Sequence, residues 1–270
     1  MVTSCTSAVR TDGIAVLTID QPDSRVNVLT GVVWADLETA IAAIASRPDV
    51  KGLVLASAKP GTFIAGADLK LLGDAPTPND TAVREFIEQG RRVLDKLETL
   101  PFPTCAAIDG AALGGGLEVA LACDTRMVGQ NPKVSLGLPE VKLGLIPGWG
   151  GTQRLPRIIG WEAASKMLTS GEPIAAAEAV RLGLAFDGGS DPVAAASSRV
   201  VQVDRDRERQ RKRDPLPMST AVREALMVMV AGAPRPLPEA LALETEAFQR
   251  LAGSPESKRL IGEFFASRKK

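Results

Sequence analysis

The sequence predicts an α/β protein with parallel strand pairing. Short apolar runs that favour strands alternate with longer amphipathic stretches that favour helices, and this alternation is typical of parallel α/β folds. The second half of the chain is increasingly helical. With 270 residues, of which 45% are hydrophobic, the chain can bury a sizeable core in one domain and still carry an appendage.

The N-terminal elements are a strand pair and a helix. Residues Val9–Arg10 and Ile14–Ile19 flank Asp12-Gly13, a dipeptide that favours a tight hairpin turn. Residues Val32–Ser46 have apolar side chains at helical spacing, and Pro48 follows them and favours an end to the helix.

The next stretch alternates clearly between the two kinds of element. Lys51–Ser57 is a short apolar run that predicts a buried strand, whereas Val83–Leu100 is a long amphipathic stretch that predicts a helix ending at Pro101. Thr104–Ile108 predicts another buried strand, which the turn dipeptide Asp109-Gly110 ends.

Helices dominate the remainder. We predict them over Gly150–Ile159, Trp161–Thr169, Ala175–Leu182 and most of the final segment. The mixed charge run Asp204–Asp214 favours a solvated helix or linker over a phosphate-binding segment. Prolines in the stretches 215–217 and 234–238 divide this region into separate helical pieces.

Composition narrows the classes of partner and compartment. Basic and acidic residues balance at 32 each, so net charge gives no reason to expect nucleic-acid binding. No stretch approaches the roughly 20 apolar residues of a membrane span, and residues 1–10 do not resemble a secretory signal. The odd count of three cysteines, without a CxxC pair, favours a reduced, cytoplasmic compartment. Cys105 and Cys123 lie in apolar runs, which favours packing over a reactive thiol.

Missing residue types narrow the chemistry. The chain has no histidine, which excludes Ser-His-Asp and Cys-His catalysis and histidine-based zinc sites. It has no Gly-Lys dipeptide, so a GxxxxGK[ST] phosphate loop is absent. Because tyrosine is absent too, acid-base catalysis must fall to carboxylates, lysines or backbone groups.

Two kinds of residue could form a site. The glycines Gly114–Gly116 follow a predicted strand and would let a ligand approach the N–H groups of a helix start, although a tightly packed turn explains them equally well. Val119 breaks a GxGxxG dinucleotide pattern. Glu118 and Glu140 are single charges in apolar or glycine-rich sequence. Either one alone is more simply a structural residue, but two carboxylates in one site can divide acid and base roles.

Three segments resemble signatures of the crotonase superfamily, also called the enoyl-CoA hydratase/isomerase family. They are AGAD at Ala65–Asp68, GGGLE at Gly114–Glu118, and PE followed by GLIPGWGGTQRLPR between Pro139 and Arg157. The resemblance runs from about Val9 to Asp187. It implies a spiral of ββα units over residues 1–190 and a helical C-terminal region over residues 191–270.

The resemblance also implies an enzyme that adds water across the 2,3 double bond of an acyl-CoA. Glu118 and Glu140 would be catalytic, and the backbone N–H groups of Ala67 and Gly115 would form an oxyanion hole. Coenzyme A contacts would come from Arg25, Val26, Ala65, Gly66, Asp68 and Leu69. The pocket would include Gly114, Gly116, Pro139, Gly148 and Trp149. Neither a metal nor a separate cofactor is implied, since coenzyme A is part of the substrate.

Trp149 departs from the small residue usual in PGxGG of the family, which leaves a packing role and an effect on pocket width both open. A Δ3-Δ2 enoyl-CoA isomerase and a non-catalytic acyl-CoA-binding module are the alternative functions.

Finer features resemble one branch of the family. Ser24–Thr30, Val50–Leu69 and Gly150–Gly160 are similar to the hydratase part of bifunctional fatty-acid oxidation α-subunits. The tail Ala242–Lys270 is similar to the helix before their 3-hydroxyacyl-CoA dehydrogenase domain. This branch would imply β-oxidation, with that domain and a thiolase as partners. Stand-alone relatives would instead imply a homotrimer or hexamer.

Overall fold

The computed structural model describes residues 3–73, 80–214, 219–252, 254–259 and 261. The chain divides into two compact units, Met1–Asp214 and Pro215–Lys270. Residues 191–214, which the family resemblance groups with the C-terminal region, therefore belong to the first unit. The prolines of segment 215–217 and the end of the tail, residues 262–270, lie outside the described residues.

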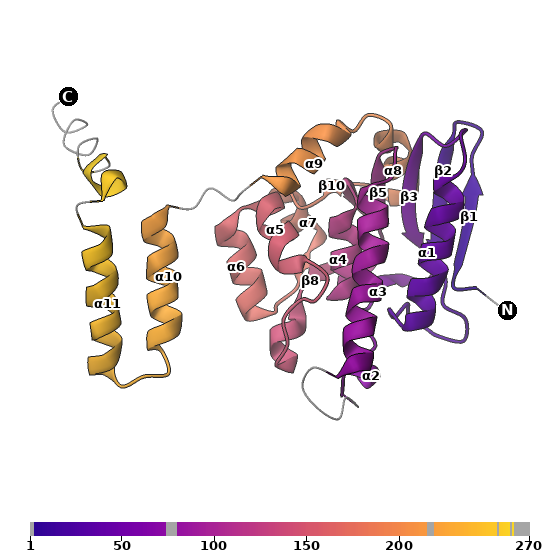
Figure 1. The fold of residues 1–270 in the computed structure, drawn as a ribbon. Coiled ribbons are helices and arrows are strands. Elements are labelled where there is room, and N and C mark those ends of the chain that lie inside the picture. Colours follow the sequence, from indigo (N-terminus) through magenta and orange to yellow (C-terminus); the bar gives the residue numbers. More distant parts are fainter. Residues whose placement is uncertain (1–2, 74–79, 215–218, 253, 260, 262–270) are drawn as a thin grey trace. The chain divides into compact units, whose positions relative to one another are not determined.

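A six-stranded sheet in the order β1-β2-β3-β5-β7-β10 forms the centre of the first unit (Figure 1). Its strands are β1 (Cys5–Val9), β2 (Ile14–Ile19), β3 (Gly52–Ser57), β5 (Thr104–Ile108), β7 (Thr125–Val128) and β10 (Phe186–Asp187). The predicted hairpin is confirmed, because β1 and β2 pair antiparallel across the Asp12-Gly13 turn. All other pairs of this sheet are parallel, as the alternation of strands and helices predicts.

A second sheet, in the order β4-β6-β8-β9, was not predicted. Its strands are β4 (Gly61–Ile64), β6 (Gly110–Leu113), β8 (Ser135–Gly137) and β9 (Ile174–Ala175). They are short and rich in glycine and alanine, which have weak strand preference. Gly110 has to be a glycine, because a Cβ there would lie 2.0 Å from the carbonyl carbon of Gly61.

The two sheets explain the repeating unit of the fold. Each of the strands β3, β5 and β7 is followed directly by a short strand of the second sheet and then by helix. The expected spiral of ββα units is therefore confirmed. The prediction that Asp109-Gly110 ends the strand is wrong in part: β5 ends there, but β6 of the second sheet begins at Gly110, so the turn passes the chain from one sheet to the other.

Helices pack on both faces of the large sheet, with α1 and α4 on one face and α8 on the other. The helices of the first unit are α1 (Gly31–Ala45), α2 (Leu69–Gly73), α3 (Thr81–Glu98), α4 (Gly115–Ala122), the 3₁₀ helix η1 (Pro139–Leu143), α5 (Gly151–Ile159), α6 (Trp161–Ser170), α7 (Ala176–Arg181), α8 (Pro192–Val200) and α9 (Arg205–Arg213). Leu53 and Leu55 of β3 face the main core with α1, α3 and α4, while Val54 and Ala56 face α8. Burial on both faces explains why β3 is a continuous apolar run.

Side-chain caps set the starts of the two long predicted helices. Thr30 accepts a hydrogen bond from the backbone N–H of Val33 at the start of α1. Asp80 does the same for Ala82 and Val83 at the start of α3. Since these side chains satisfy otherwise unpaired N–H groups, both helices begin one or two residues before the predicted limits.

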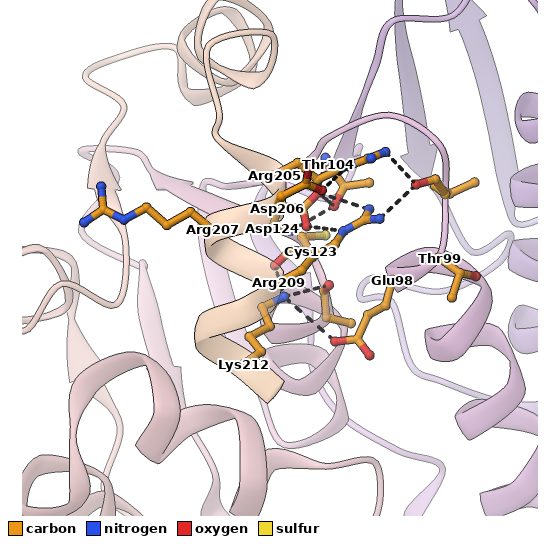
Figure 2. A network of polar contacts seen from close by, with 12 residues as sticks. Glu98, Thr99, Thr104, Cys123, Asp124, Arg205, Asp206, Arg207, Arg209 and Lys212 are labelled. Atoms are coloured by element: carbon orange, nitrogen blue, oxygen red, sulfur yellow. Dashed lines mark hydrogen bonds and ion pairs between the residues drawn. The ribbon is translucent and has the colours of Figure 1, made fainter. Parts of the chain in front are cut away.

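Helix α9 confirms that the charge run is helical, but one of its faces contacts the rest of the first unit instead of solvent. Arg209 makes an ion pair of 2.9 Å with Asp124, which is 1% exposed, and Lys212 donates to the carbonyls of Ala122 and Cys123 at the end of α4. Figure 2 shows these side chains directed from α9 toward the ends of other helices, while Arg207 points away. One face of α9 therefore supplies the donors that C-terminal carbonyls lack.

The second unit contains α10 (Thr220–Gly232) and α11 (Leu237–Leu251), which pack on each other. Gly232 permits close approach, because a Cβ there would lie 3.1 Å from Ala240 Cβ. Within the described ranges, no helix of either unit is long and apolar enough to cross a membrane.

Candidate active site

A cavity of about 220 Å³ lies where the loop after β4, the start of α4, η1 and the loop before α5 converge. The structure brings eleven of the predicted site residues into its lining. They are Ala65, Gly66, Ala67, Leu69, Gly114, Gly115, Glu118, Pro139, Glu140, Gly148 and Trp149. Residues far apart in the sequence thus meet in one pocket, including both glutamates.

Four predicted residues are not in this lining. Arg25 is exposed and Val26 half-buried in the loop before α1, while the Asp68 carboxylate accepts from the N–H of Lys70 at the start of α2. Gly116 corrects the pocket prediction: a Cβ there would lie 2.2 Å from the carbonyl oxygen of Ile64, so this glycine serves the packing of α4 on β4. A run of three glycines cannot show which one faces a ligand and which one faces protein.

Two glycines with positive φ shape the loops that carry Ala67 and Gly115. Gly66 has φ 122° and Gly114 has φ 52°, values that favour glycine. The Gly66 carbonyl and the Asp68 N–H both bond to Leu29, so the N–H of Ala67 between them points to the opposite side.

Gly115 is the first residue of α4, and its N–H has no partner within the helix. Within the described part of the chain, neither the Ala67 N–H nor the Gly115 N–H donates to the protein. Both donors are therefore available to a ligand in the cavity.

Glu118 lies on the first turn of α4 and is 1% exposed. Its Oε1 accepts hydrogen bonds of 2.7 Å from the backbone N–H groups of Trp149 and Gly151, which fix the carboxyl group. Its Oε2 is buried and has no hydrogen-bond partner among the residues that the structure describes. Burial, together with a smaller effect of the nearby Glu140, raises the pKa of Glu118 to about 7, against the opposing effect of those two hydrogen bonds.

Glu140 reaches the same cavity from η1. Its Oε1 lies close to Gly114, where a Cβ would be 2.9 Å from it, and its Oε2 is also buried with no partner in the described ranges. Burial raises the pKa of Glu140 as well. The pocket thus holds two carboxyl groups, each with one oxygen free to exchange a proton with a bound molecule.

Trp149 is both a packing residue and a wall of the cavity. It is 3% exposed, and its indole makes edge contacts with Trp34 and Phe86 at centroid distances of 5.1 and 5.2 Å. Its Nε1 donates to the carbonyl of Ile87 at 3.0 Å. The backbone N–H of the same residue holds Glu118, so the loop before α5 links the core to the catalytic candidate.

Several apolar lining residues were not predicted from the sequence. They are Leu72, Val83 and Ile87 on or beside α2 and α3, and Leu143, Leu145 and Ile146 after Glu140. Ile146 is 72% exposed. An apolar cluster next to a glutamate and a glycine-rich loop is the signal that could have found the second group. The helical face that turns Val83 and Ile87 toward the cavity depends on tertiary packing.

No group of three or more histidine, cysteine, aspartate or glutamate side chains in the described ranges could hold a metal ion. The lining of the cavity includes the carboxyl groups of Glu118 and Glu140 and the backbone of Ala67 and Gly115.

Known proteins resemble this chain in sequence and in fold. Residues 9–270 match the model of a family described as enoyl-CoA hydratase/isomerase. Among solved structures, the chain is similar to an enoyl-CoA hydratase from Bacillus anthracis, with 29% identity, 99% of this chain and 97% of that chain covered, and a TM-score of 0.65. A second similar structure is an enoyl-CoA hydratase from Geobacillus kaustophilus HTA426, with 30% identity, coverage of 99% and 95%, and a TM-score of 0.64. A third is Pseudomonas aeruginosa DspI, with 27% identity, coverage of 98% and 94%, and a TM-score of 0.64.

Proposed function

Because the chain belongs to the enoyl-CoA hydratase/isomerase family, we propose that it is an enoyl-CoA hydratase that adds water to 2-trans-enoyl-CoA thioesters. One observation carries the proposal: two carboxyl groups, each with a buried oxygen that has no partner among the described residues, share a cavity with two backbone N–H groups that are unpaired in the same part of the chain. Hydration needs these elements, a base, an acid and an oxyanion site, in one place.

The backbone donors would act on the thioester carbonyl. When water attacks C3, negative charge develops on that carbonyl oxygen, and the N–H groups of Ala67 and Gly115 would stabilise the resulting enolate. Loss of one such donor typically costs about 3–4 kcal/mol of transition-state stabilisation. The left-handed turns at Gly66 and Gly114 hold the donors in position before substrate binds.

The two glutamates would divide the proton transfers. Glu118 is held through Oε1, so its free Oε2 would take a proton from the attacking water as the C3–O bond forms. Glu140, whose pKa is raised by burial, would deliver a proton to C2. In the reverse reaction the roles interchange.

The test is to replace each glutamate by glutamine. The amide keeps the size and the hydrogen-bond acceptor of the side chain but cannot transfer the proton, so we expect turnover of crotonyl-CoA to fall by about two orders of magnitude or more. Binding of the thioester should be largely retained. Hydration, followed as loss of the conjugated thioester absorbance, that stays near wild type in both E118Q and E140Q would contradict the assignment.

Two other functions give different results in the same assay. A Δ3-Δ2 isomerase needs one base to move a proton between C2 and C4, so faster turnover of 3-enoyl than 2-enoyl thioesters would favour it. A non-catalytic module would bind acyl-CoA without changing the conjugated thioester absorbance, whether the 2-enoyl or the 3-enoyl thioester is supplied. The presence of two carboxyl groups with unpartnered oxygens favours hydration.

The cellular setting follows from the sequence resemblance alone. We propose a role in fatty-acid β-oxidation in the cytoplasm, with a 3-hydroxyacyl-CoA dehydrogenase acting on the product, because hydration creates the hydroxyl group that such an enzyme oxidises. Co-purification of dehydrogenase activity with the chain from its source, or its absence, tests this part.

A further inference from the structure

The indole of Trp149 lies against one of the proposed oxyanion donors. Gly115, one of the two proposed oxyanion donors, has the six-membered ring of Trp149 against it, because a Cβ on Gly115 would lie 2.5 Å from the indole Cζ3. An acyl chain whose carbonyl is held by Gly115 would therefore meet the indole within a few atoms. Trp149 forms the inner wall of the cavity beside Glu118.

This wall is fixed. The indole is anchored by the hydrogen bond from Nε1 to the Ile87 carbonyl and by the edge contacts with Trp34 and Phe86. On the side of α3, Gly90 leaves no space, because a Cβ there would lie 2.3 Å from the Trp149 Nε1. The side chain could not turn away to admit a longer substrate without breaking the hydrogen bond and leaving a void in the core.

The space on the other side of Trp149 does not suit an acyl chain. Gly148 and Trp149 also line a second cavity, of about 400 Å³, whose remaining lining is mostly charged or polar. It includes the ion pair between Glu98 and Arg154, at 2.8 Å, and Lys212 of α9. An apolar chain extended in this direction would have to displace hydration from charged groups, at a cost in free energy.

We propose that Trp149 is a specificity-determining residue that restricts this chain to short 2-enoyl groups, an inference that rests on the proposed function. The cavity volume of about 220 Å³ agrees with it, since pockets that enclose drug-sized ligands usually measure roughly 300–1,000 Å³. Crotonyl-CoA is then a better substrate than decenoyl-CoA for the wild type. Removing the indole lengthens the pocket between α3 and α4.

The experiment compares hydration of crotonyl-, hexenoyl-, octenoyl- and decenoyl-CoA by wild type, W149A and W149L. The backbone N–H that holds Glu118 is kept in both variants, so the change acts on the wall. We expect the ratio of kcat/KM for decenoyl-CoA to that for crotonyl-CoA to rise at least about tenfold, because one methylene in an apolar pocket is worth about tenfold or more. W149L retains more of the side-chain volume and carries the test if W149A does not fold.

Trp34 provides the matched control. It is fully buried and touches Trp149 in the same aromatic cluster, but it is not in the lining of the pocket. W34F should leave the chain-length ratio within about twofold of wild type. A ratio that rises equally in W34F and W149L would show general loosening of the core and overturn the proposal.

Different outcomes separate the role of Trp149 from the proposed function. If the wild type hydrates crotonyl-CoA, and the folded W149A or W149L keeps the wild-type ratio, Trp149 does not limit the chain and only its assigned role is wrong. A wild type that already prefers decenoyl-CoA also contradicts that role and leaves the hydratase function intact. If the wild type hydrates no 2-enoyl thioester of any length, the proposed function itself is wrong, and the role of Trp149 falls with it.

Discussion

Replacement of Glu118 by glutamine should stabilise the folded protein at neutral and alkaline pH while it removes activity. Burial raises the pKa of Glu118 from 4.5 to about 7, so ionisation is more costly in the folded state than in the unfolded chain. The difference corresponds to about 3 kcal/mol, at 1.36 kcal/mol for each pH unit. Glutamine does not ionise, and its Oε1 can still accept from the N–H groups of Trp149 and Gly151.

The sign of the pH dependence follows from proton binding. Between pH 4.5 and about 7 the folded wild type holds a proton on Glu118 that the unfolded chain has lost. The contribution of the protonated Glu118 to the wild-type free energy of unfolding is therefore fully present below pH 4.5 and is lost as the pH rises to about 7. E118Q has no such loss, so its stability relative to wild type should increase by about 2–3 kcal/mol between pH 5 and pH 8.

Urea denaturation at several pH values measures this difference. Placing an amide in the pocket has a cost that does not change with pH, so it shifts the stability difference between E118Q and wild type equally at pH 5 and at pH 8. The comparison across pH therefore removes this cost. E140Q is the matched variant: Glu140 is only half-buried, so we expect a smaller gain with pH. A relative stability of E118Q that stays flat from pH 5 to pH 8, or declines, would refute the account of Glu118 as a carboxyl group strained by burial.

Three further predictions concern the pH profile, the α9 contact and one glycine. The kcat/KM for crotonyl-CoA should fall below about pH 7, because Glu118 must be ionised to act as base and its pKa is raised to about 7; a profile that is level down to pH 5 contradicts this. Burial lowers the pKa of Lys212 from 10.5 to about 8, so the unfolded chain binds the extra proton between these values and wild-type stability should rise with pH in that window. The free energy of unfolding of K212M, measured by urea denaturation, should lack this rise with pH. An equal rise in wild type and K212M would contradict the prediction. G116A should destabilise the fold by about 1–3 kcal/mol or more, because its Cβ would lie 2.2 Å from the Ile64 carbonyl oxygen, whereas G31A, whose Cβ would make an ordinary contact of 3.6 Å with Gln89 Oε1, should be nearly neutral in thermal melts.

The large sheet could be predicted from the sequence because its strands are buried on both faces. Burial of this kind requires a continuous apolar run, as in Lys51–Ser57 and Thr104–Ile108, and such a run is visible without a structure. The strands of the small sheet have no such continuous apolar run. Strand β6, Gly110–Leu113, consists of glycine, two alanines and leucine, and it is a strand because it pairs with β4 and β8. Tertiary pairing here overrides weak local preference.

The candidate site was predictable to the extent that it depends on motifs. The glycine turns and the two glutamates are local in sequence, and the structure places them around one cavity. The partners of Glu118 are not local: the N–H groups of Trp149 and Gly151 come from a loop more than thirty residues away. The charge run predicts the helix α9 but not its contacts, because a pattern of alternating charge shows which side chains are polar, and not which buried carbonyls they meet.

These distant contacts connect α9 to the catalytic candidate. Lys212 of α9 lies 3.9 Å from Glu98, and Glu98 holds Arg154 by two hydrogen bonds. Arg154 in turn donates to the Trp149 carbonyl, at 2.5 Å, from a guanidinium group that is mostly buried. The N–H of Trp149 also donates to the Glu118 carboxylate. Both backbone polar groups of Trp149 are therefore bonded, the carbonyl to Arg154 and the N–H to Glu118. A basic segment that resembles a solvated linker in sequence therefore supports the loop that orients the proposed base.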